Sequence, residues 1–386
     1  MYALLRPILF SLDAERAHNL GMTAARFAQS TAPSLVGRMY QYVHPSLRVS
    51  LWNRVFDNPV GLAAGFDKNA HLVKFWAHSG FGFCEVGSVS AKPSDGNEKP
   101  RAFRLPEDQA VINRMGLNNQ GAEEIAKRIQ RLPLGSLPPL GINLAKTHSP
   151  DIMGDKAIQD FRDSFAQLAP LAGYLVLNIS CPNTREGKTF EEPEALDALL
   201  GAIMKDRKKM GLTVPVLIKL SPAYSSQTVY DSAIEEMLQV TKDYDVAGFI
   251  VSNTMSDRRG LNTSKKTLEK IGAGGLSGAP LAERSTALVR YIYRETDGEK
   301  PIIAVGGIDS AQRAYKNIRA GATLVQVYTG LVYKGLGLVK RINKGIVQLL
   351  QQDGLTSIQQ AVGLDATPIV NPMKPEAQSK QVMEAA

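Results

Sequence analysis

The chain has 386 residues, of which 44% are hydrophobic and 21% are charged. This composition excludes global disorder, and the length suits a single α/β barrel with additions. The net charge of +8 is compatible with nucleic acid, an anionic membrane surface or acidic ligands, but the absence of long basic runs argues weakly against nucleic acid. Cys84 and Cys181 form neither a disulfide framework nor a CxxC metal pair, which favours a reducing compartment.

The first 45 residues differ from the rest of the chain. A short apolar stretch, LLRPILFSL, precedes a helical pattern over 14–29 with Asp13 as its N-cap, and a further short helix is expected at 35–43. Short apolar helices that carry arginines can lie in a membrane interface, or they can pack on the main core as a cap, and the pattern favours neither. No apolar run approaches the roughly 20 residues of a membrane span, and no signal-peptide cleavage site follows.

Short apolar runs recur after residue 45, with helical patterns such as 157–172 and 310–321 between most of them. Most runs are apolar throughout, as is typical of parallel strands buried on both faces. They predict a (β/α)8 TIM barrel, with a doubly wound open sheet as the competing architecture. The predicted strands are at 59–67, 83–89, 140–146, 174–180, 215–221, 246–253, 301–307 and 324–329.

These patterns divide the chain into a helical extension at 1–45, a barrel at 46–365 and a flexible tail at 366–386. The connections at 90–117 and 254–280 are long, which in a compact domain indicates either function or disorder.

The ends of the predicted strands carry an unusual set of side chains, rich in asparagine and poor in carboxylates and histidine. In a barrel, catalytic groups gather at these ends. One asparagine alone is more often a turn residue, but several together can read an amide or imide edge of a ligand. Lys68 and Lys219 suit an anionic ligand or a charge that develops during reaction. No metal-binding pattern is present, so no catalytic metal is expected.

Two further features have a chemical interpretation. Gly306 and Gly307 precede a helix start after the seventh strand, where barrels commonly bind phosphate, although a tight turn is the simpler interpretation. Cys84 lies inside a strand and is expected to be a core residue. Cys181, in NISCPNT, lies beyond a strand and before a proline. No histidine is placed in sequence to activate it as a nucleophile, so a proton-transfer role fits better.

Nine motifs then resemble dihydroorotate dehydrogenase, in the family's order and over nearly the whole chain. They are AAGFDKN (63–69), INRMGLNNQG (112–121), GINLAK (141–146), NISCPNT (178–184), IKLSP (218–222), VSNT (251–254), GGLSGAPL (274–281), VGGIDS (305–310) and QVYTG (326–330).

The resemblance implies a (β/α)8 barrel that holds FMN and oxidises (S)-dihydroorotate to orotate in de novo pyrimidine (UMP) synthesis. A base takes the C5 proton, hydride passes from C6 to flavin N5, and quinone reoxidises the flavin. Lys219 would stabilise the charge of the reduced flavin. The implied flavin-binding residues are Ala64, Gly65, Phe66, Asp67, Lys68, Ser88, Asn143, Asn178, Lys219, Ser252, Gly278, Gly307, Tyr328 and Thr329.

The resemblance also implies a substrate site and a quinone site. Lys68 would bind the substrate carboxylate. The N-terminal helices would form a quinone tunnel, with His18, Arg104 and Tyr328 near its inner end. The implied substrate-binding residues are Lys68, Asn113, Arg114, Met115, Gly116, Leu117, Asn178, Asn183, Asn253 and Thr254.

The stretches DAERAHNL (13–20) and AFRLPEDQAVINRMG (102–116) resemble the quinone-linked class 2 branch of the family. We therefore expect a peripheral protein on the cytoplasmic side of the cell membrane, held on an anionic membrane surface by the N-terminal helices. Two positions depart from this branch, because Cys181 stands where serine is usual and Leu117 where phenylalanine is usual. We predict that Cys181 is the general base, since a thiol ionises near pH 8.5 and a serine hydroxyl far above it.

Three alternative functions are compatible with the residues. The first is the same dehydrogenation with a soluble acceptor such as fumarate or NAD, in which case the extension is only a cap. The second is an FMN barrel that reduces tRNA uridines, a tRNA dihydrouridine synthase, for which no basic RNA-binding module is visible. The third is a phosphate-binding barrel without catalytic activity.

Overall fold

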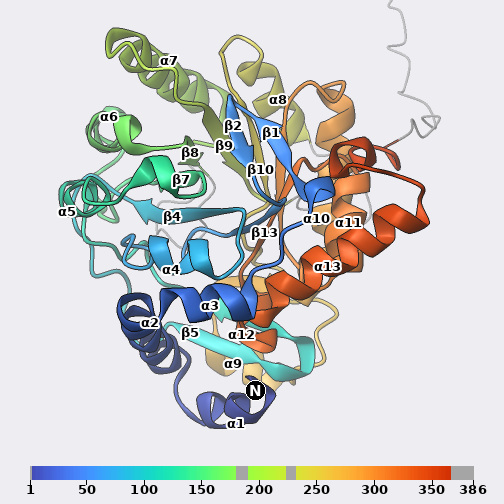
Figure 1. Ribbon diagram of the computed structural model, residues 1–386. Coiled ribbons are helices and arrows are strands. Elements are labelled where there is room, and N and C mark those ends of the chain that lie inside the picture. The colour runs from blue at the N-terminus through green and yellow to red at the C-terminus, as the bar shows by residue number, and fades with distance from the viewer. Residues whose placement is uncertain (1, 180–189, 223–231, 367–386) are drawn as a thin grey trace, which may run out of the picture.

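The computed structural model describes residues 2–179, 190–222 and 232–366, and its centre is a closed parallel barrel (Figure 1). The strands follow one another in the order β10-β12-β13-β3-β4-β7-β8-β9, and β10 pairs with both β9 and β12. The predicted strands and barrel are therefore confirmed. The barrel strands are β3 (Val60–Leu62), β4 (Phe83–Val89), β7 (Leu140–Leu144), β8 (Tyr174–Asn178), β9 (Val216–Leu220), β10 (Gly248–Val251), β12 (Ile302–Val305) and β13 (Leu324–Val327).

Amphipathic helices cover the outside of the barrel. In α11 the buried residues Ala311, Ala314, Tyr315 and Ile318 recur every three or four positions, which places them on one face. Fully burying a side chain the size of Ile318 contributes about 1.5–3 kcal/mol. The helices of this layer are α4 (Val73–His78), α5 (Ala122–Ile129), α6 (Asp155–Leu168), α7 (Pro193–Lys209), α8 (Ser232–Thr241), α10 (Ala282–Glu295), α11 (Ala311–Arg319), α12 (Thr329–Lys334) and α13 (Gly337–Gln352).

Aromatic side chains fill the amino-terminal end of the barrel. An antiparallel hairpin of β1 (Val49–Leu51) and β2 (Arg54–Phe56) brings Phe56 against Phe83, with ring centroids 5.5 Å apart, and Phe83 lies 6.3 Å from Tyr174. A Cβ at Gly61 would lie 2.3 Å from the Phe83 ring, so this ring requires a glycine beside it. Any ligand site must therefore open at the other end. The sequence analysis did not predict this hairpin.

The two long connections are ordered and form a second sheet beyond the carboxyl ends of the barrel strands. In this antiparallel sheet the order is β11-β6-β5, with β5 (Ala102–Leu105), β6 (Ala110–Asn113) and β11 (Gly275–Gly278). A short helix, α9 (Lys265–Ile271), precedes β11. The sheet has its own small apolar core, which includes Leu105, Ile112 and Leu276.

The N-terminal extension packs on the same side of the molecule as this second sheet (Figure 1). It consists of α1 (Tyr2–Ser11), α2 (Ala14–Thr31) and α3 (Pro33–Tyr40), and the predicted cap is present because Asp13 accepts hydrogen bonds from the first turn of α2. Arg101, at the start of β5, donates to both carboxylate oxygens of Glu15 on α2, at 2.9 and 3.2 Å. This largely buried, bidentate ion pair fixes the extension to the barrel domain.

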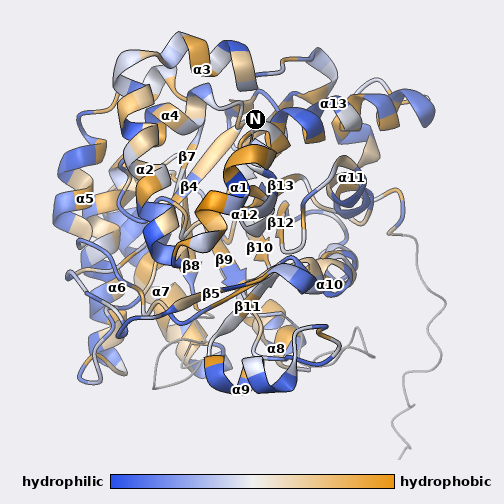
Figure 2. Ribbon diagram, turned by 90° about the horizontal axis from the view of Figure 1, so that it is seen from below, coloured by the Kyte–Doolittle hydropathy of each residue, from blue (hydrophilic) through white to orange (hydrophobic). Residues whose placement is uncertain are grey.

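The extension presents large apolar side chains outward, and α1 is mostly hydrophobic (Figure 2). Leu4, Ile8 and Phe27 are 80%, 65% and 71% exposed. The two interpretations of 1–45 are thus compatible, because the helices pack on the core and still present apolar side chains outward. Among the described helices, none combines the length and the hydropathy that a membrane span requires.

Candidate active site

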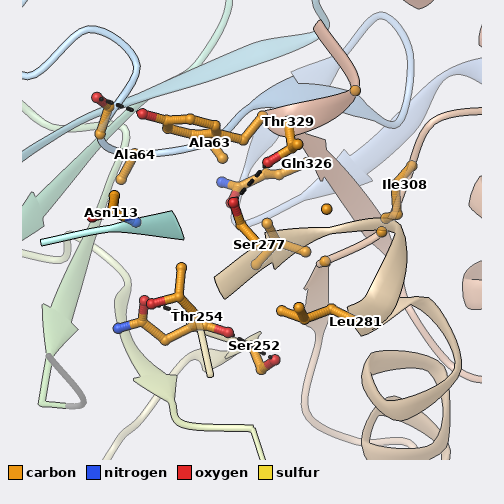
Figure 3. Close-up of a pocket in the computed structure, with 18 of the residues that line it drawn as sticks. Ala63, Ala64, Asn113, Ser252, Thr254, Ser277, Leu281, Ile308, Gln326 and Thr329 are labelled. Atoms are coloured by element: carbon orange, nitrogen blue, oxygen red, sulfur yellow. Dashed lines mark hydrogen bonds between the residues drawn. The ribbon is translucent and has the colours of Figure 1, made fainter. Parts of the chain in front are cut away.

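A cavity at the carboxyl end of the barrel, roofed by the β5–β6–β11 sheet, brings most of the predicted site residues together (Figure 3). Its empty space is about 1230 Å³, including the open mouth. The predicted residues that line it are Ala64, Gly65, Lys68, Ser88, Asn113, Met115, Gly116, Leu117, Asn178, Lys219, Ser252, Asn253, Thr254, Gly278, Gly307, Tyr328 and Thr329.

A chain of polar side chains crosses the floor of the cavity. Asn253 donates to Asn178 Oδ1 at 3.2 Å, Asn178 donates to Ser88 Oγ at 2.9 Å, and Ser88 donates to Asn143 Oδ1 at 2.5 Å. These residues come from the ends of four strands, so barrel closure brings them together. The cavity therefore presents fixed amide and hydroxyl groups, which can match the donors and acceptors of a flat heterocycle.

Two lysines, Lys219 and the half-buried Lys68, supply positive charge to the cavity. Lys219, on β9, is 7% exposed. Burial, and then the charge of Arg101, lowers the pKa of Lys68 to about 8, against the opposing effect of Glu15. Near neutral pH both sites still favour an anionic ligand, and Lys68 can lose its charge within an accessible pH range.

One side of the cavity is built from close backbone approaches. Gly307 has a φ of +69°, and a Cβ there would lie 2.5 Å from Ala282 Cα. Gly306, Gly307 and the residues up to Asp309 line this side, and Ser277 and Thr329 face each other across it with their hydroxyl oxygens 2.8 Å apart (Figure 3). Backbone N–H groups and hydroxyls suit a phosphate.

A sequence model described as dihydroorotate dehydrogenase matches residues 46–350. The chain belongs to the dihydroorotate dehydrogenase family. This confirms the family predicted from the motifs, and the family matches cover the barrel and the second sheet together.

Curated relatives and solved structures extend the match to most of the chain. The dihydroorotate dehydrogenase (quinone) of Natronomonas pharaonis is 42% identical over 366 residues, covering 95% of this chain and 99% of the relative. That of Nocardia farcinica is 40% identical over 367 residues, covering 95% and 97%. The ligand-free DHODH of Eimeria tenella superposes with a TM-score of 0.78 at 32% identity, covering 89% of this chain and 99% of that one. The same protein in complex with ferulenol gives 0.77 at 33% identity, covering 89% and 96%.

Four residues expected at the dihydroorotate dehydrogenase cavity do not line it. Asn143 is reached only through Ser88. The carboxylate of Asp67 accepts hydrogen bonds from the backbone N–H groups of His71 and Leu72, at 2.9 and 2.7 Å. Asp67 therefore holds the turn before α4 and does not line the cavity.

The other two have structural partners nearby. Arg114 donates to carbonyl oxygens of Ile271, Ala273 and Pro100, so its guanidinium fastens the second sheet. Phe66 packs between His18 and Tyr328, with ring centroids 5.1 and 5.2 Å away.

The predicted quinone residues lie where the extension meets the cavity. His18, Phe66 and Tyr328 form a series of edge-to-face rings from α2 to the cavity wall. Burial, and then the charge of Lys68, lowers the pKa of His18 to about 4, so its imidazole is neutral at working pH. Arg104 donates to carbonyl oxygens at the end of α1, including that of Leu9 at 2.8 Å, and neither Arg104 nor His18 lines the cavity itself.

Two predicted residues, Cys181 and Asn183, lie outside the residues that the structure describes. Conversely, the cavity includes residues that the sequence analysis did not select, among them Gln109, Ser277, Asp309 and Gln326. Gln326 had a usable signal, because it is a polar residue within the apolar run LVQV.

Proposed function

We propose that the protein is an FMN-dependent dihydroorotate dehydrogenase that passes electrons to a membrane quinone in pyrimidine biosynthesis. The observation that carries the proposal is the cavity itself, where an amide-lined floor, the two lysines Lys68 and Lys219 and the glycine turn at Gly306–Gly307 meet beside the N-terminal helices. The family and the names of its relatives agree with it.

The residues present fit FMN. The Gly307 side offers backbone N–H groups for the phosphate, the Asn178–Ser88 chain offers partners for the flavin ring, and Lys219 offers a charge that would stabilise a reduced flavin. When bound, FMN would supply the hydride acceptor. The protein's part is to hold and orient the two ligands against each other.

Dihydroorotate would bind between the floor and the β5–β6–β11 roof. Lys68 would pair with its carboxylate, while Asn113, on β6, and the adjacent Asn253 and Thr254, which follow β10, would contact the ring. Together with Lys68, these residues come from three segments of the chain. Their separate origins favour this assignment, because four convergent polar groups can define both position and orientation.

Cys181 is the proposed general base at C5 of the substrate. Support comes from its place three residues after Asn178, which lines the cavity, and from the ordinary thiol pKa of about 8.5, which is close to working pH.

The quinone would approach through the extension. The exposed apolar side chains of α1 and α2 suit a peripheral, membrane-associated protein, and the ring series runs from His18 on α2 to Tyr328 at the cavity. The soluble-acceptor alternative would leave this exposed apolar surface without a role.

Steady-state turnover with different acceptors tests the proposal. The full chain, reconstituted with FMN and a short-chain quinone in detergent, should oxidise dihydroorotate rapidly, and fumarate or NAD should support less than a hundredth of that rate. Equal or faster turnover with fumarate or NAD would contradict the quinone assignment.

A further inference from the structure

A buried carboxylate lies in the barrel directly below the residues that line the cavity. Glu85, in the middle of β4, is 0% exposed and does not line the cavity itself. Its Oε1 accepts from Asn143 Nδ2 at 2.9 Å, and its Oε2 accepts from Gln326 Nε2 at 2.7 Å and from the Tyr174 hydroxyl at 3.2 Å. Side chains from three barrel strands thus converge on the Glu85 carboxylate, which belongs to a fourth strand.

The carboxylate decides which way the two amides face. An ionised carboxylate only accepts hydrogen bonds, so Asn143 and Gln326 must each turn their NH₂ group toward Glu85. Their carbonyl oxygens then point away. Burial and the neighbouring Glu85 raise the pKa of Tyr174 well above its ordinary value, so its hydroxyl also stays a donor. All three partners therefore fit a negative charge at Glu85.

The two amide oxygens have different environments. Asn143 Oδ1 accepts from Ser88, which lines the cavity. Gln326 is 1% exposed and lines the cavity, and its Oε1 is buried without a hydrogen-bond partner among the described residues. A buried acceptor without a hydrogen-bond partner is unfavourable, and this one belongs to a residue that lines the cavity.

We propose that Glu85 is a positioning residue for the cofactor, which orients Gln326 so that its Oε1 accepts a hydrogen bond from an N–H or O–H group of bound FMN. Through Asn143 it also orients the Ser88 hydroxyl. This inference rests on the proposed function, because it takes FMN as the occupant of the cavity.

The charge of Glu85 has a second consequence. A negative charge at Glu85 would disfavour the additional negative charge of a reduced flavin in the cavity, and would therefore lower the reduction potential of bound FMN. A role in packing alone would not change this potential, so the potential separates a positioning role from a purely structural one.

Three variants of the full-length chain test the proposal by FMN titration and by the midpoint potential of the bound flavin. Glu85→Gln keeps the shape and removes the charge, so that three donors compete for one carbonyl oxygen. We expect the FMN dissociation constant to rise about tenfold or more and the midpoint potential to rise. Gln326→Leu should also raise the dissociation constant about tenfold, the value of one hydrogen bond to a buried acceptor. Tyr174→Phe is the matched control, since it removes a donor to the same carboxylate from a residue that does not itself line the cavity, and its FMN affinity should stay within about twofold of wild type.

Each outcome decides a definite point. A folded Glu85→Gln protein with wild-type affinity and potential overturns the proposal. If Glu85→Gln does not fold, wild-type affinity in folded Gln326→Leu overturns it. An equal loss in Tyr174→Phe shows that Glu85 only holds the barrel together, which also overturns it. A wild-type chain that binds no FMN overturns the proposed function itself, and with it this inference.

Discussion

Raising the pH from 7 to 9 should weaken dihydroorotate binding through Lys68. Burial and the charge of Arg101 lower the pKa of this lysine to about 8. Below that pH the ammonium is charged and attracts the substrate carboxylate. Above it the amine is neutral, and the attraction is lost. The affinity should therefore fall as the pH rises through 8, whereas a lysine with the ordinary pKa of about 10.4 would show almost no change in this range.

The size of the effect follows from the charged fraction of Lys68. With a pKa of about 8, that fraction falls from about 90% at pH 7 to about 10% at pH 9. If only the charged form binds, the dissociation constant of dihydroorotate rises about tenfold, which corresponds to about 1.4 kcal/mol.

Stopped-flow reduction of the flavin by substrate, without oxygen, gives this dissociation constant from the saturation of the rate. The rate of flavin reduction at saturating substrate is a separate quantity, and it reports on proton transfer to the general base. Lys68→Arg is the control, because arginine stays charged and its dissociation constant should not depend on pH in this range. A wild-type dissociation constant that is unchanged between pH 7 and 9 would refute the reasoning about Lys68.

Four further changes test other parts of the account. Cys181→Ala should abolish flavin reduction by substrate while FMN stays bound, and near-wild-type reduction would exclude Cys181 as the base. Glu15→Gln removes the charge that Arg101 binds, so it should lower the free energy of unfolding by about 2 kcal/mol. It should also slow quinone turnover without slowing flavin reduction. Lys99→Met is the control, because Lys99 is exposed and 3.5 Å from Glu15, and it should change neither the stability nor the turnover. Gly307→Ala should weaken FMN binding about tenfold, since its φ is left-handed and a Cβ has no room, and unchanged binding would show that the glycine turn adapts. Ile8→Asp should reduce co-sedimentation with anionic vesicles about tenfold without changing thermal stability, because the side chain is exposed, and unchanged co-sedimentation would place the membrane contact elsewhere.

The barrel was predictable because its strands are buried on both faces. Runs such as YLVLN and PVLIK contain almost no polar residues, and this pattern identifies a parallel strand without any contact information. The hairpin β1–β2 and the β5–β6–β11 sheet were not predicted. Their strands are only three or four residues long, and polar and turn residues separate them. Their structure depends on pairing with strands that are distant in the sequence.

The candidate-site residues at the carboxyl ends of the strands were predictable, whereas those inside the barrel were not. Asn178 and Lys219 follow or interrupt apolar runs at the end of the barrel where ligands bind, so their position indicated a role. Glu85 and Gln326 also interrupt apolar strands, but their importance depends on which strands face each other across the barrel. Asp67 is the opposite case. Its place in a motif implied a contact with the ligand, but in the structure its carboxylate holds the turn before α4.

The most direct measurement of the central claim is the visible spectrum of the purified full-length chain during an anaerobic titration. The account predicts a yellow protein whose flavin absorbance is bleached by (S)-dihydroorotate and restored by a quinone, but not by fumarate or NAD. A flavin spectrum that dihydroorotate leaves unchanged, or a protein that binds no flavin, would contradict it.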